Sequence, residues 1–282
     1  MSRLTVQLVT WNGVQYIPHL FQSLRAQTLR DWDCIVIDNG STDGTIEAIA
    51  HELATFDRPH RFIRNDENSG FAGGHNQAFA LSETPFVQLL NQDIVLAPEY
   101  LERVLAAMET MPEAGAMQGV LLRWGFHAVT AGTGDGRTDT IDTLGLRVLR
   151  NRRVVEWMTG ERIPDSRFQI PDSPFEVFGV SGALPMYRRA ALTDVALDGE
   201  VFDRAFFSYK EDVDLAFRLC MTGWRAFIVR GARAWHDRTA AGPRELSDYA
   251  TVDSRRTKSA LVRYHSYKNH LFVLMKNEHL VN

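Results

Sequence analysis

Short apolar runs alternate with helical patterns along the first 122 residues, and this alternation constrains the fold more than any other feature. The apolar runs predict strands at 4–9, 34–37, 62–64, 86–90 and 116–122. Apolar residues at helical spacing predict helices at 17–24, 45–53, 72–81 and 98–111. Strands that alternate with helices form βαβ units, so we expect an α/β fold with a mostly parallel central sheet flanked by helices.

The second half of the chain is less regular. Between 123 and 172 several glycines stand among Thr and Asp residues, which predicts hairpins and a long loop. Regular structure resumes with a strand at 184–187, a helix at 213–222 and a strand at 225–229. We expect residues 1–122 and 123–253 to be two halves of one domain, followed by a separate segment at 254–282.

The segment 254–277 is basic and amphipathic. It carries six Lys or Arg residues and no Asp or Glu. Its apolar stripe recurs at spacings of three and four and consists of Ala260, Tyr264, Tyr267, Leu271 and Leu274. Such a helix can lie on an anionic membrane surface, or it can pack its apolar stripe on the domain, and the sequence leaves both alternatives open.

Charge and cysteine content exclude several classes of protein. Thirty-one Lys and Arg residues against 35 Asp and Glu residues give a net charge of −4, which argues against nucleic acid as a partner. The two cysteines, Cys34 and Cys220, suggest neither a disulfide framework nor a cysteine metal cluster. The start shows no signal-peptide pattern, and no apolar run approaches a membrane span, so a cytoplasmic protein is expected, peripheral to the membrane if 254–277 binds it.

Polar residues follow the first two predicted strands. In open parallel sheets ligands bind beyond the carboxyl ends of the strands, so these positions are candidates for a site. Thr10, Trp11 and Asn12 follow the first strand, where a helix-capping turn is the simpler alternative. Asp38 and Asn39 follow the second strand, and their short polar side chains can contact a base or a ribose.

Two further loops follow in the same half of the chain. The glycine-containing loop 68–76 opens a helix and is suited to approach an anion, although it lacks the spacing of a Walker or dinucleotide-binding loop. Asp93 lies just beyond an apolar strand, preceded by Asn91 and Gln92. A carboxylate at such a place needs a cation or hydrogen-bond donors, and a divalent ion on a diphosphate would satisfy that need.

Carboxylates and a histidine mark the second half. Glu211, Asp212 and Asp214 lie among aromatic residues ahead of a predicted helix, where they can favour the helix N-terminus or supply a base. His236 follows the last strand and can ligate a metal or serve as a hydrogen-bonded structural residue. Spacing alone does not choose among the three carboxylates.

Taken in order, these motifs resemble the family 2 inverting glycosyltransferases, and within them the rhamnosyltransferase-like group. The resemblance extends from about Leu4 to Met275. It is carried by the segments 9–12, 37–45, 68–76, 90–93 and 202–215.

The resemblance implies a GT-A type fold, a nucleotide-diphosphate sugar donor and a Mg²⁺ or Mn²⁺ ion. The first half, 1–122, would bind the nucleotide-sugar, and the second half, 123–253, would bind the acceptor and carry the base. Asp212 would be the catalytic base, and Asp93 with His236 the metal-binding residues. The nucleotide-sugar-binding residues would be Thr10, Trp11, Asn12, Asp38, Asn39, Gly70, Asn76, Asn91, Gln92 and Asp93.

The expected reaction moves a sugar to a hydroxyl of a glycan or lipid-linked glycan, with L-rhamnose from dTDP-rhamnose as the best-fitting donor. Asn39 replaces a frequent acidic residue of the family, which is compatible with thymine, and Asn91-Gln92-Asp93 leaves one carboxylate where the metal motif usually has more. The alternatives are a nucleotidyltransferase that forms nucleotide-sugars and a non-catalytic binding module. The loop after the first strand lacks the basic residue expected of the former, and retention of Asp93 and Asp212 argues against the latter.

Overall fold

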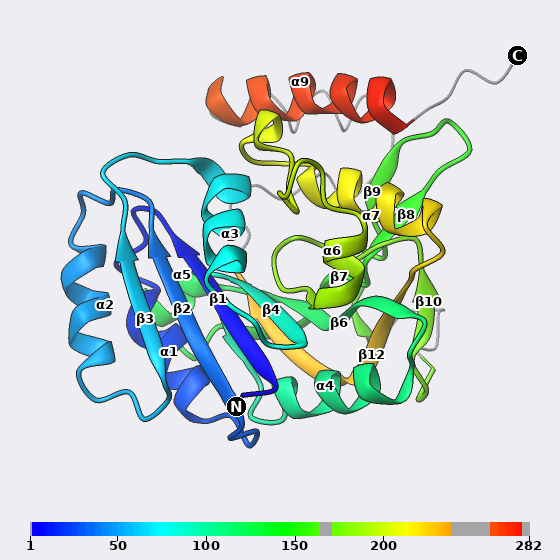
Figure 1. Cartoon of the computed structure of the whole chain (residues 1–282). Helices are drawn as coiled ribbons and strands as arrows, with labels where there is room; N and C mark the ends of the chain where they lie inside the picture. The colour runs from blue at the N-terminus through cyan, green and yellow to red at the C-terminus, as the bar shows by residue number, and fades with distance from the viewer. Residues whose placement is uncertain (1, 164–170, 238–259, 278–282) are drawn as a thin grey trace, which may run out of the picture.

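The computed structural model describes residues 2–163, 171–237 and 260–277. Its N-terminal part is a parallel sheet whose strands are connected by helices (Figure 1). The strands are β1 (Leu4–Thr10), β2 (Trp32–Asp38), β3 (His60–Arg64) and β4 (Phe86–Asn91). The connecting helices are α1 (Ile17–Arg25), α2 (Thr45–Leu53) and α3 (Gly70–Ala80). The alternation predicted for this part is confirmed.

The sheet continues into the second half of the chain. Its further strands are β5 (Ile94–Leu96), β6 (Ala114–Trp124), β7 (Arg137–Thr143), β10 (Phe175–Val177), β11 (Met186–Arg188) and β12 (Arg225–His236). The strands β8 (Leu146–Val148) and β9 (Val154–Glu156) form a separate pair. The remaining helices are α4 (Tyr100–Thr110), α5 (Phe126–Thr130), α6 (Arg189–Asp194), the 3₁₀ turn η2 (Arg204–Phe206), α7 (Glu211–Met221) and α9 (Ala260–Asn277).

Six strands of the central sheet point in one direction. The strand order is β10-β12-β6-β11-β4-β1-β2-β3, and β11 runs antiparallel to both of its neighbours. Because β6 opposes β11 and β11 opposes β4, the strands β6 and β4 share a direction, and β12 is parallel to β6. The expected mostly parallel sheet flanked by helices is therefore confirmed. One sheet passes through both halves of the chain, and the boundary between them at residue 122 stays a prediction.

Two hydrophobic cores cover the two faces of the sheet. Helices α1, α2 and α4 pack on one face, where Phe21, Ile49 and Leu105 are buried. Helices α3, α6 and α7 pack on the other, where Leu192 and Leu215 are buried. Side chains of a strand alternate between these faces, which is why β1, β2, β4 and β6 are buried along nearly their whole length.

Helix α9 packs on α7 and η2 through a face that the sequence did not predict. Its buried residues are His265, Asn269 and Val273. The predicted apolar stripe points away from the domain, with Tyr264 63% and Tyr267 62% exposed. Of the helices in the described ranges, none is long and apolar enough to cross a membrane.

Candidate active site

The carboxylate of Asp38 organises the loop that follows β2. Its Oδ2 accepts hydrogen bonds from the hydroxyls of Thr10 (3.0 Å) and Ser41 (2.6 Å), and its Oδ1 accepts one from the Ser41 N–H (2.9 Å). Asp38 and Thr10 are both buried. The side chain thus ties together the ends of β1 and β2, and its predicted contact with a nucleotide stays a prediction.

Gln92 holds the exposed loop after β1. Its side chain accepts a hydrogen bond from the Trp11 N–H (3.0 Å) and donates one to the Trp11 carbonyl (3.1 Å). Gly13 is required here, because a Cβ at that position would lie 2.3 Å from Gln92 Cδ. Asn12 Oδ1 accepts a hydrogen bond from the Thr42 N–H (2.8 Å). The main chain of Trp11 is thereby held beside Gln92, and its side chain is 46% exposed.

Two buried asparagines fix the start of α3. Asn39 donates to the Gly70 carbonyl (3.0 Å) and accepts a hydrogen bond from the Ser69 hydroxyl (3.0 Å). Asn76 donates to the Phe202 carbonyl (2.7 Å) and accepts from the Phe202 N–H (2.9 Å). Both side chains are bound to neighbouring loops, so they shape the region predicted to bind the donor.

Asp93 and His236, which are far apart in the sequence, come together beyond the carboxyl ends of β4 and β12. His236 Nε2 lies 3.3 Å from Asp93 Oδ2. On the other side of the ring, His236 Nδ1 lies 2.9 Å from Asp142 Oδ2. Asp142 belongs to β7 and is fully buried. The structure therefore unites the two predicted metal-binding residues and adds a carboxylate that orients the imidazole.

Positive charge is favoured between Asp93 and Asp142, and here it is carried by the protonated imidazole of His236, whose Nε2 proton a metal ion would have to displace. Burial by itself lowers the pKa of His236, but the carboxylates of Asp93 and Asp142 outweigh it and raise the pKa to about 10. The Asp142 contact occupies Nδ1 and leaves Nε2 facing Asp93.

The spacing of the two side chains also fits a metal ion. Two ligands at about 2.1 Å from one octahedral ion lie roughly 3 Å apart, close to the spacing observed here. Within the described parts of the chain, no group of three or more His, Cys, Asp or Glu is able to hold a metal ion.

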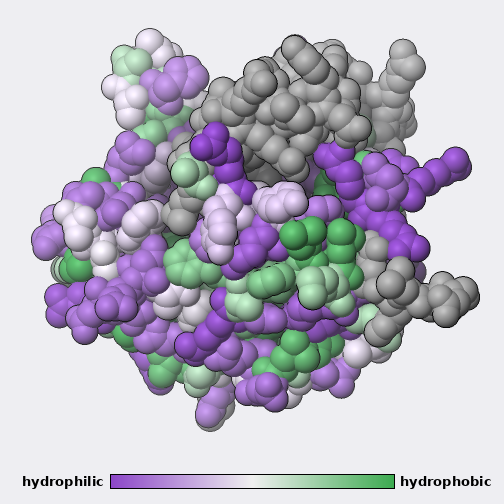
Figure 2. Space-filling view, turned by 90° about the horizontal axis from the view of Figure 1, so that it is seen from above, coloured by the Kyte–Doolittle hydropathy of each residue, from purple (hydrophilic) through white to green (hydrophobic). Residues whose placement is uncertain are grey.

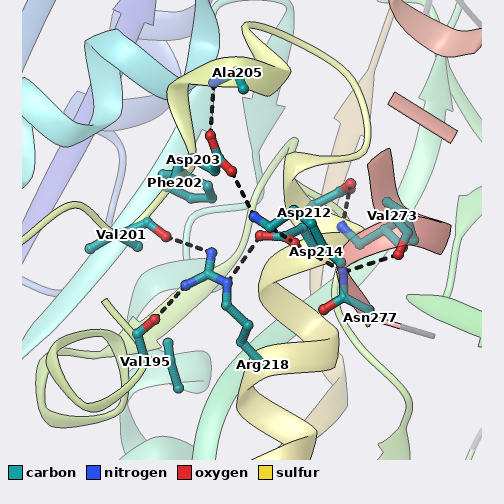
Figure 3. A network of polar contacts seen from close by, with 12 residues as sticks. Val195, Val201, Phe202, Asp203, Ala205, Asp212, Asp214, Arg218, Val273 and Asn277 are labelled. Carbon is teal, nitrogen blue, oxygen red and sulfur yellow. Dashed lines mark hydrogen bonds and ion pairs between the residues drawn. The ribbon is translucent and has the colours of Figure 1, made fainter. Parts of the chain in front are cut away.

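Asp214, the last of three carboxylates at the start of α7, is buried and held in ion pairs. It is fully buried, and its Oδ2 lies 3.0 Å from Arg218 Nε (Figure 3). Its Oδ1 lies 3.1 Å from Lys276 Nζ, which also contacts Asp203 Oδ2 at 2.7 Å. Figure 3 shows how these charges connect α7 with α9 and with Asp203, which lies just ahead of η2. Asp214 is therefore committed to this internal network.

Glu211 and Asp212 differ in exposure. Glu211 is buried, and burial together with the charge of Asp212 raises its pKa to about 8. Asp212 is partly exposed. Its Oδ2 accepts a hydrogen bond from the Gly182 N–H (2.9 Å), and its Oδ1 accepts one from the Val213 N–H (2.8 Å). Of the three carboxylates, Asp212 is the one that is partly exposed and held by main-chain donors.

A short main-chain segment connects the two candidate centres. Gly182 donates to Asp212, and the next residue, Ala183, accepts a hydrogen bond from the Asn91 N–H (3.0 Å). Asn91 ends β4, two residues before Asp93. The candidate base and the candidate metal-binding carboxylate thus lie on the same edge of the sheet.

Asp142 and Lys276 are not among the residues predicted from the sequence. Asp142 lies in the stretch that was predicted to be irregular, and only the alternation of Ile141 with polar neighbours signals a strand there. Lys276 was counted among the basic residues of a surface helix, whereas the structure turns it inward toward Asp203 and Asp214. Both roles depend on contacts between segments distant in sequence.

Comparison with known families identifies the chain. Residues 86–261, more than half of the chain, match the model for Glycosyl transferase family group 2. The chain belongs to the family 2 glycosyltransferases. Residues 5–123 of this glycosyltransferase also match the model for Glycosyl transferase family 2.

A rhamnosyltransferase is among its relatives. The glycosyltransferase is 27% identical over 291 residues to N-acetylglucosaminyl-diphospho-decaprenol L-rhamnosyltransferase from Mycobacterium tuberculosis. The match covers 93% of this chain and 85% of the relative. The rhamnosyltransferase-like resemblance seen in the motifs is thereby confirmed.

Solved structures confirm the GT-A fold of this glycosyltransferase. GalNAc-T7, crystallised with UDP, GalNAc and Mn²⁺, superposes with a TM-score of 0.68 at 13% identity over 96% of this chain. The chain spans only about half of that structure, 48%. The mannosyltransferase PcManGT from Pyrobaculum calidifontis, in complex with GDP-Man and Mn²⁺, gives a TM-score of 0.59 at 16% identity over 98% of this chain and 70% of its own.

Proposed function

We propose that this glycosyltransferase transfers L-rhamnose from dTDP-rhamnose, with inversion, to a hydroxyl group of a lipid-linked glycan at the cytoplasmic face of a membrane. The observation that carries the sugar and the acceptor is the similarity, over 93% of the chain, to a relative named as a rhamnosyltransferase of a decaprenol-linked N-acetylglucosamine. The proposed base chemistry is supported by the partial exposure of Asp212 and its main-chain hydrogen bonds. The proposed metal chemistry is supported by the contact between Asp93 and His236.

Asp93 and His236 would hold a Mg²⁺ or Mn²⁺ ion together with the diphosphate of the donor. Their 3.3 Å separation and the orienting contact of Asp142 support this role. Bound there, the ion supplies positive charge beside the oxygen on which negative charge develops as the nucleotide leaves. Two structural neighbours, crystallised with Mn²⁺ and a nucleotide or nucleotide-sugar, agree with a divalent ion in this fold.

Asp212 would act as the general base. As the acceptor oxygen forms its bond to the anomeric carbon, Asp212 takes the hydroxyl proton, and the bond from that carbon to the diphosphate oxygen breaks. Nucleoside diphosphate leaves on the face opposite the attacking oxygen, so the configuration inverts. The partial exposure of Asp212 supports this assignment, because Asp214 is held in ion pairs and Glu211 is buried with a raised pKa.

The donor would lie along the loops that end β1, β2 and β4. Trp11 offers an exposed aromatic face, and Asn12 lies beside it. The remaining predicted residues, Thr10, Asp38, Asn39, Gly70, Asn76, Asn91 and Gln92, would hold these loops in place or offer main-chain groups to the nucleotide.

The direct test is a donor panel with a synthetic N-acetylglucosaminyl-diphospholipid as the acceptor. The enzyme is assayed with dTDP-rhamnose and with UDP-sugars, with and without Mn²⁺, and the anomeric configuration of the product is read by NMR. Transfer from dTDP-rhamnose with inversion supports the proposal. Transfer from UDP-sugars alone would refute the rhamnosyl preference, and retention of configuration would refute the single displacement.

A further inference from the structure

The outward face of α9 is apolar although the helix already packs on the domain. Tyr264, Tyr267, Leu271 and Met275 recur at spacings of three and four and therefore share one face. Leu271 is 43% and Met275 80% exposed. Figure 2 views the molecule from the side of α9 and shows apolar and weakly polar side chains gathered across the middle of this face, bordered by hydrophilic ones. We refer to these four residues as the α9 outer face.

Charge accompanies this apolar face. The segment 254–277 has six Lys or Arg residues and no acidic residue, in a protein whose net charge is −4. Two of these cations contact the domain, because Lys268 donates to the Ala205 carbonyl (2.5 Å) and Lys276 pairs with Asp203 (2.7 Å). Arg263 is exposed on the helix. The segment thus combines exposed aromatic and aliphatic side chains with positive charge, the composition of a helix that lies in a membrane interface.

We propose that the α9 outer face binds an anionic lipid bilayer. The tyrosines would sit at the headgroup level with the aliphatic side chains just below, and the basic residues would be attracted to anionic headgroups. A second copy of the chain fits this face less well, because a symmetric contact would bring two basic segments together. The inference deepens the proposed function, since it explains how the enzyme reaches a lipid-linked acceptor.

Vesicle flotation tests this surface without any need for activity. The full chain is mixed with vesicles of phosphatidylcholine alone or with phosphatidylglycerol. The wild type should float with the anionic vesicles only, and the double variant Leu271→Glu/Met275→Glu should lose roughly tenfold or more in binding. Met221→Glu is the matched control, because Met221 is also exposed, at 57%, but lies on α7. Thermal melts should show that both variants are folded.

Three outcomes would overturn the membrane surface. They are no flotation of the wild type, equal flotation of wild type and double variant, and a dimer in sedimentation equilibrium that the double variant dissociates. A wild type that transfers rhamnose to a water-soluble acceptor but does not float would refute this inference and leave the proposed function intact.

A second inference rests on the loop between η2 and α7. Three of its residues have a left-handed backbone although none is glycine, with φ of 62° at Phe207, 75° at Tyr209 and 67° at Lys210. This conformation is unfavourable for ordinary side chains and persists only where the surroundings hold it. Lys210 is the N-cap of α7, and Asp212 follows two residues later. The conformation of this loop therefore determines where Asp212 points.

Asn269 of α9 contacts this loop from the buried side. Its Nδ2 group is shared among the carbonyls of Phe206 (2.8 Å), Ser208 (2.8 Å) and Tyr209 (2.6 Å), and the residue is fully buried. On the opposite side the Phe207 carbonyl accepts a hydrogen bond from the Ala72 N–H (3.2 Å). The loop is thus held between α9 and the start of α3.

We infer that Asn269 is a positioning residue, which holds the loop so that Asp212 faces the acceptor hydroxyl. This inference rests on the role of Asp212 in the proposed function. Loss of the Asn269 amide removes donors from three carbonyls at once, and the loop is then free to leave its left-handed conformation. A small displacement of a base reduces the rate of the chemical step more than it reduces donor binding.

Asn269→Ala is the test, with Asn277→Ala as the matched control on the same helix. With dTDP-rhamnose and the N-acetylglucosaminyl-diphospholipid, Asn269→Ala should lower kcat roughly tenfold or more while the donor KM changes little. Amide hydrogen exchange over 206–212 should accelerate in this variant, and Asn269→Gln should restore part of kcat. If Asn269→Ala changes kcat no more than Asn277→Ala, the inference falls. If Asp212→Asn is fully active, the proposed base falls instead, so the two failures can be told apart.

Discussion

His236 Nε2 and Asp93 Oδ2 lie 3.3 Å apart at the carboxyl ends of β12 and β4, two strands that are separated in the sheet by β6 and β11. The contact is possible because β5, which begins one residue after Asp93, pairs antiparallel with the end of β12 and places Ile94 opposite His236. Neither residue alone would hold a divalent ion firmly, so we expect the ion and the nucleotide to bind together.

Asp93→Asn should therefore weaken the Mn²⁺-dependent binding of dTDP by about tenfold or more, because an amide is a poorer ligand than a carboxylate for a hard cation. Isothermal titration with and without Mn²⁺ measures this effect. Binding in the absence of the ion should be the same for wild type and variant. Equal Mn²⁺ enhancement in both proteins would show that Asp93 is not a ligand.

Asp142 should matter for metal affinity although it does not face the ion. Replacement Asp142→Ala leaves Nδ1 of His236 without its acceptor, and loss of such an orienting partner lowers metal affinity by roughly 10- to 100-fold. Asp139→Ala, on the same strand but exposed, is the matched control. Mn²⁺ titration followed by electron paramagnetic resonance gives the affinities, and Asp142→Asn, which keeps an oxygen acceptor, should recover most of the loss.

Asp212→Asn should separate binding from transfer. Without its carboxylate the enzyme cannot accept the hydroxyl proton, so kcat should fall about 100-fold or more, while dTDP and Mn²⁺ bind as in the wild type. Single-turnover transfer and isothermal titration on the same preparation distinguish the two effects. Transfer at the wild-type rate would exclude Asp212 as the base.

Glu211 should make stability depend on pH. Its pKa is about 8 in the folded protein and near 4.5 when unfolded, so the folded state holds a proton that the unfolded state releases. Its contribution to stability is complete below about 4.5 and is lost as pH rises toward about 8. The melting temperature of Glu211→Gln minus that of the wild type should therefore increase from about pH 4.5 to about pH 8 and stay constant above that pH. Glu67→Gln, which changes an exposed glutamate, should show no such trend.

Arg218 should be a major source of stability. It donates to Asp214 Oδ2 (3.0 Å) and to the carbonyls of Val195 (2.5 Å) and Val201 (2.7 Å) from a buried position. Arg218→Ala leaves the Asp214 charge buried and should cost about 3–5 kcal/mol in the free energy of unfolding. Arg204→Ala removes an exposed i,i+4 partner of Glu200 and should cost less than about 0.5 kcal/mol. Urea denaturation compares the two, and similar losses would contradict the importance of the buried network.

The strand and helix pattern predicted the fold well because burial of both sheet faces leaves a strong periodic signal, as in β1 and β2. The strand-end rule also placed Asp93 and His236 correctly at one edge. What the sequence could not supply were contacts between distant segments. Asp142 reaches His236 across 94 residues, and Asp214 is excluded as a free base by Lys276, which lies 62 positions later in the chain.

The orientation of α9 also depends on contacts between distant segments that the sequence pattern does not supply. The stripe of Tyr264, Tyr267 and Leu271 was recognised as apolar, but its direction depends on which face offers better contacts to η2 and α7. The polar side chains of Asn269 and Lys276 provide those contacts, and the apolar stripe is turned outward as a result. Hydrophobic periodicity identifies the stripe but leaves open whether it faces the domain or points away from it.

The reversed strand β11 has a consequence for how such enzymes diversify. The loops after β1, β2 and β4 leave the sheet at this edge, whereas the segment before β11 enters it and brings the Gly182 N–H to Asp212 and the Ala183 carbonyl to β4. If Asp212 is the base proposed above, residues inserted ahead of Gly182 would change the surroundings of the acceptor without lengthening any loop that follows β1, β2 or β4. Under the proposed function, changes in this segment would alter the acceptor site while the loops proposed to bind the donor keep their length.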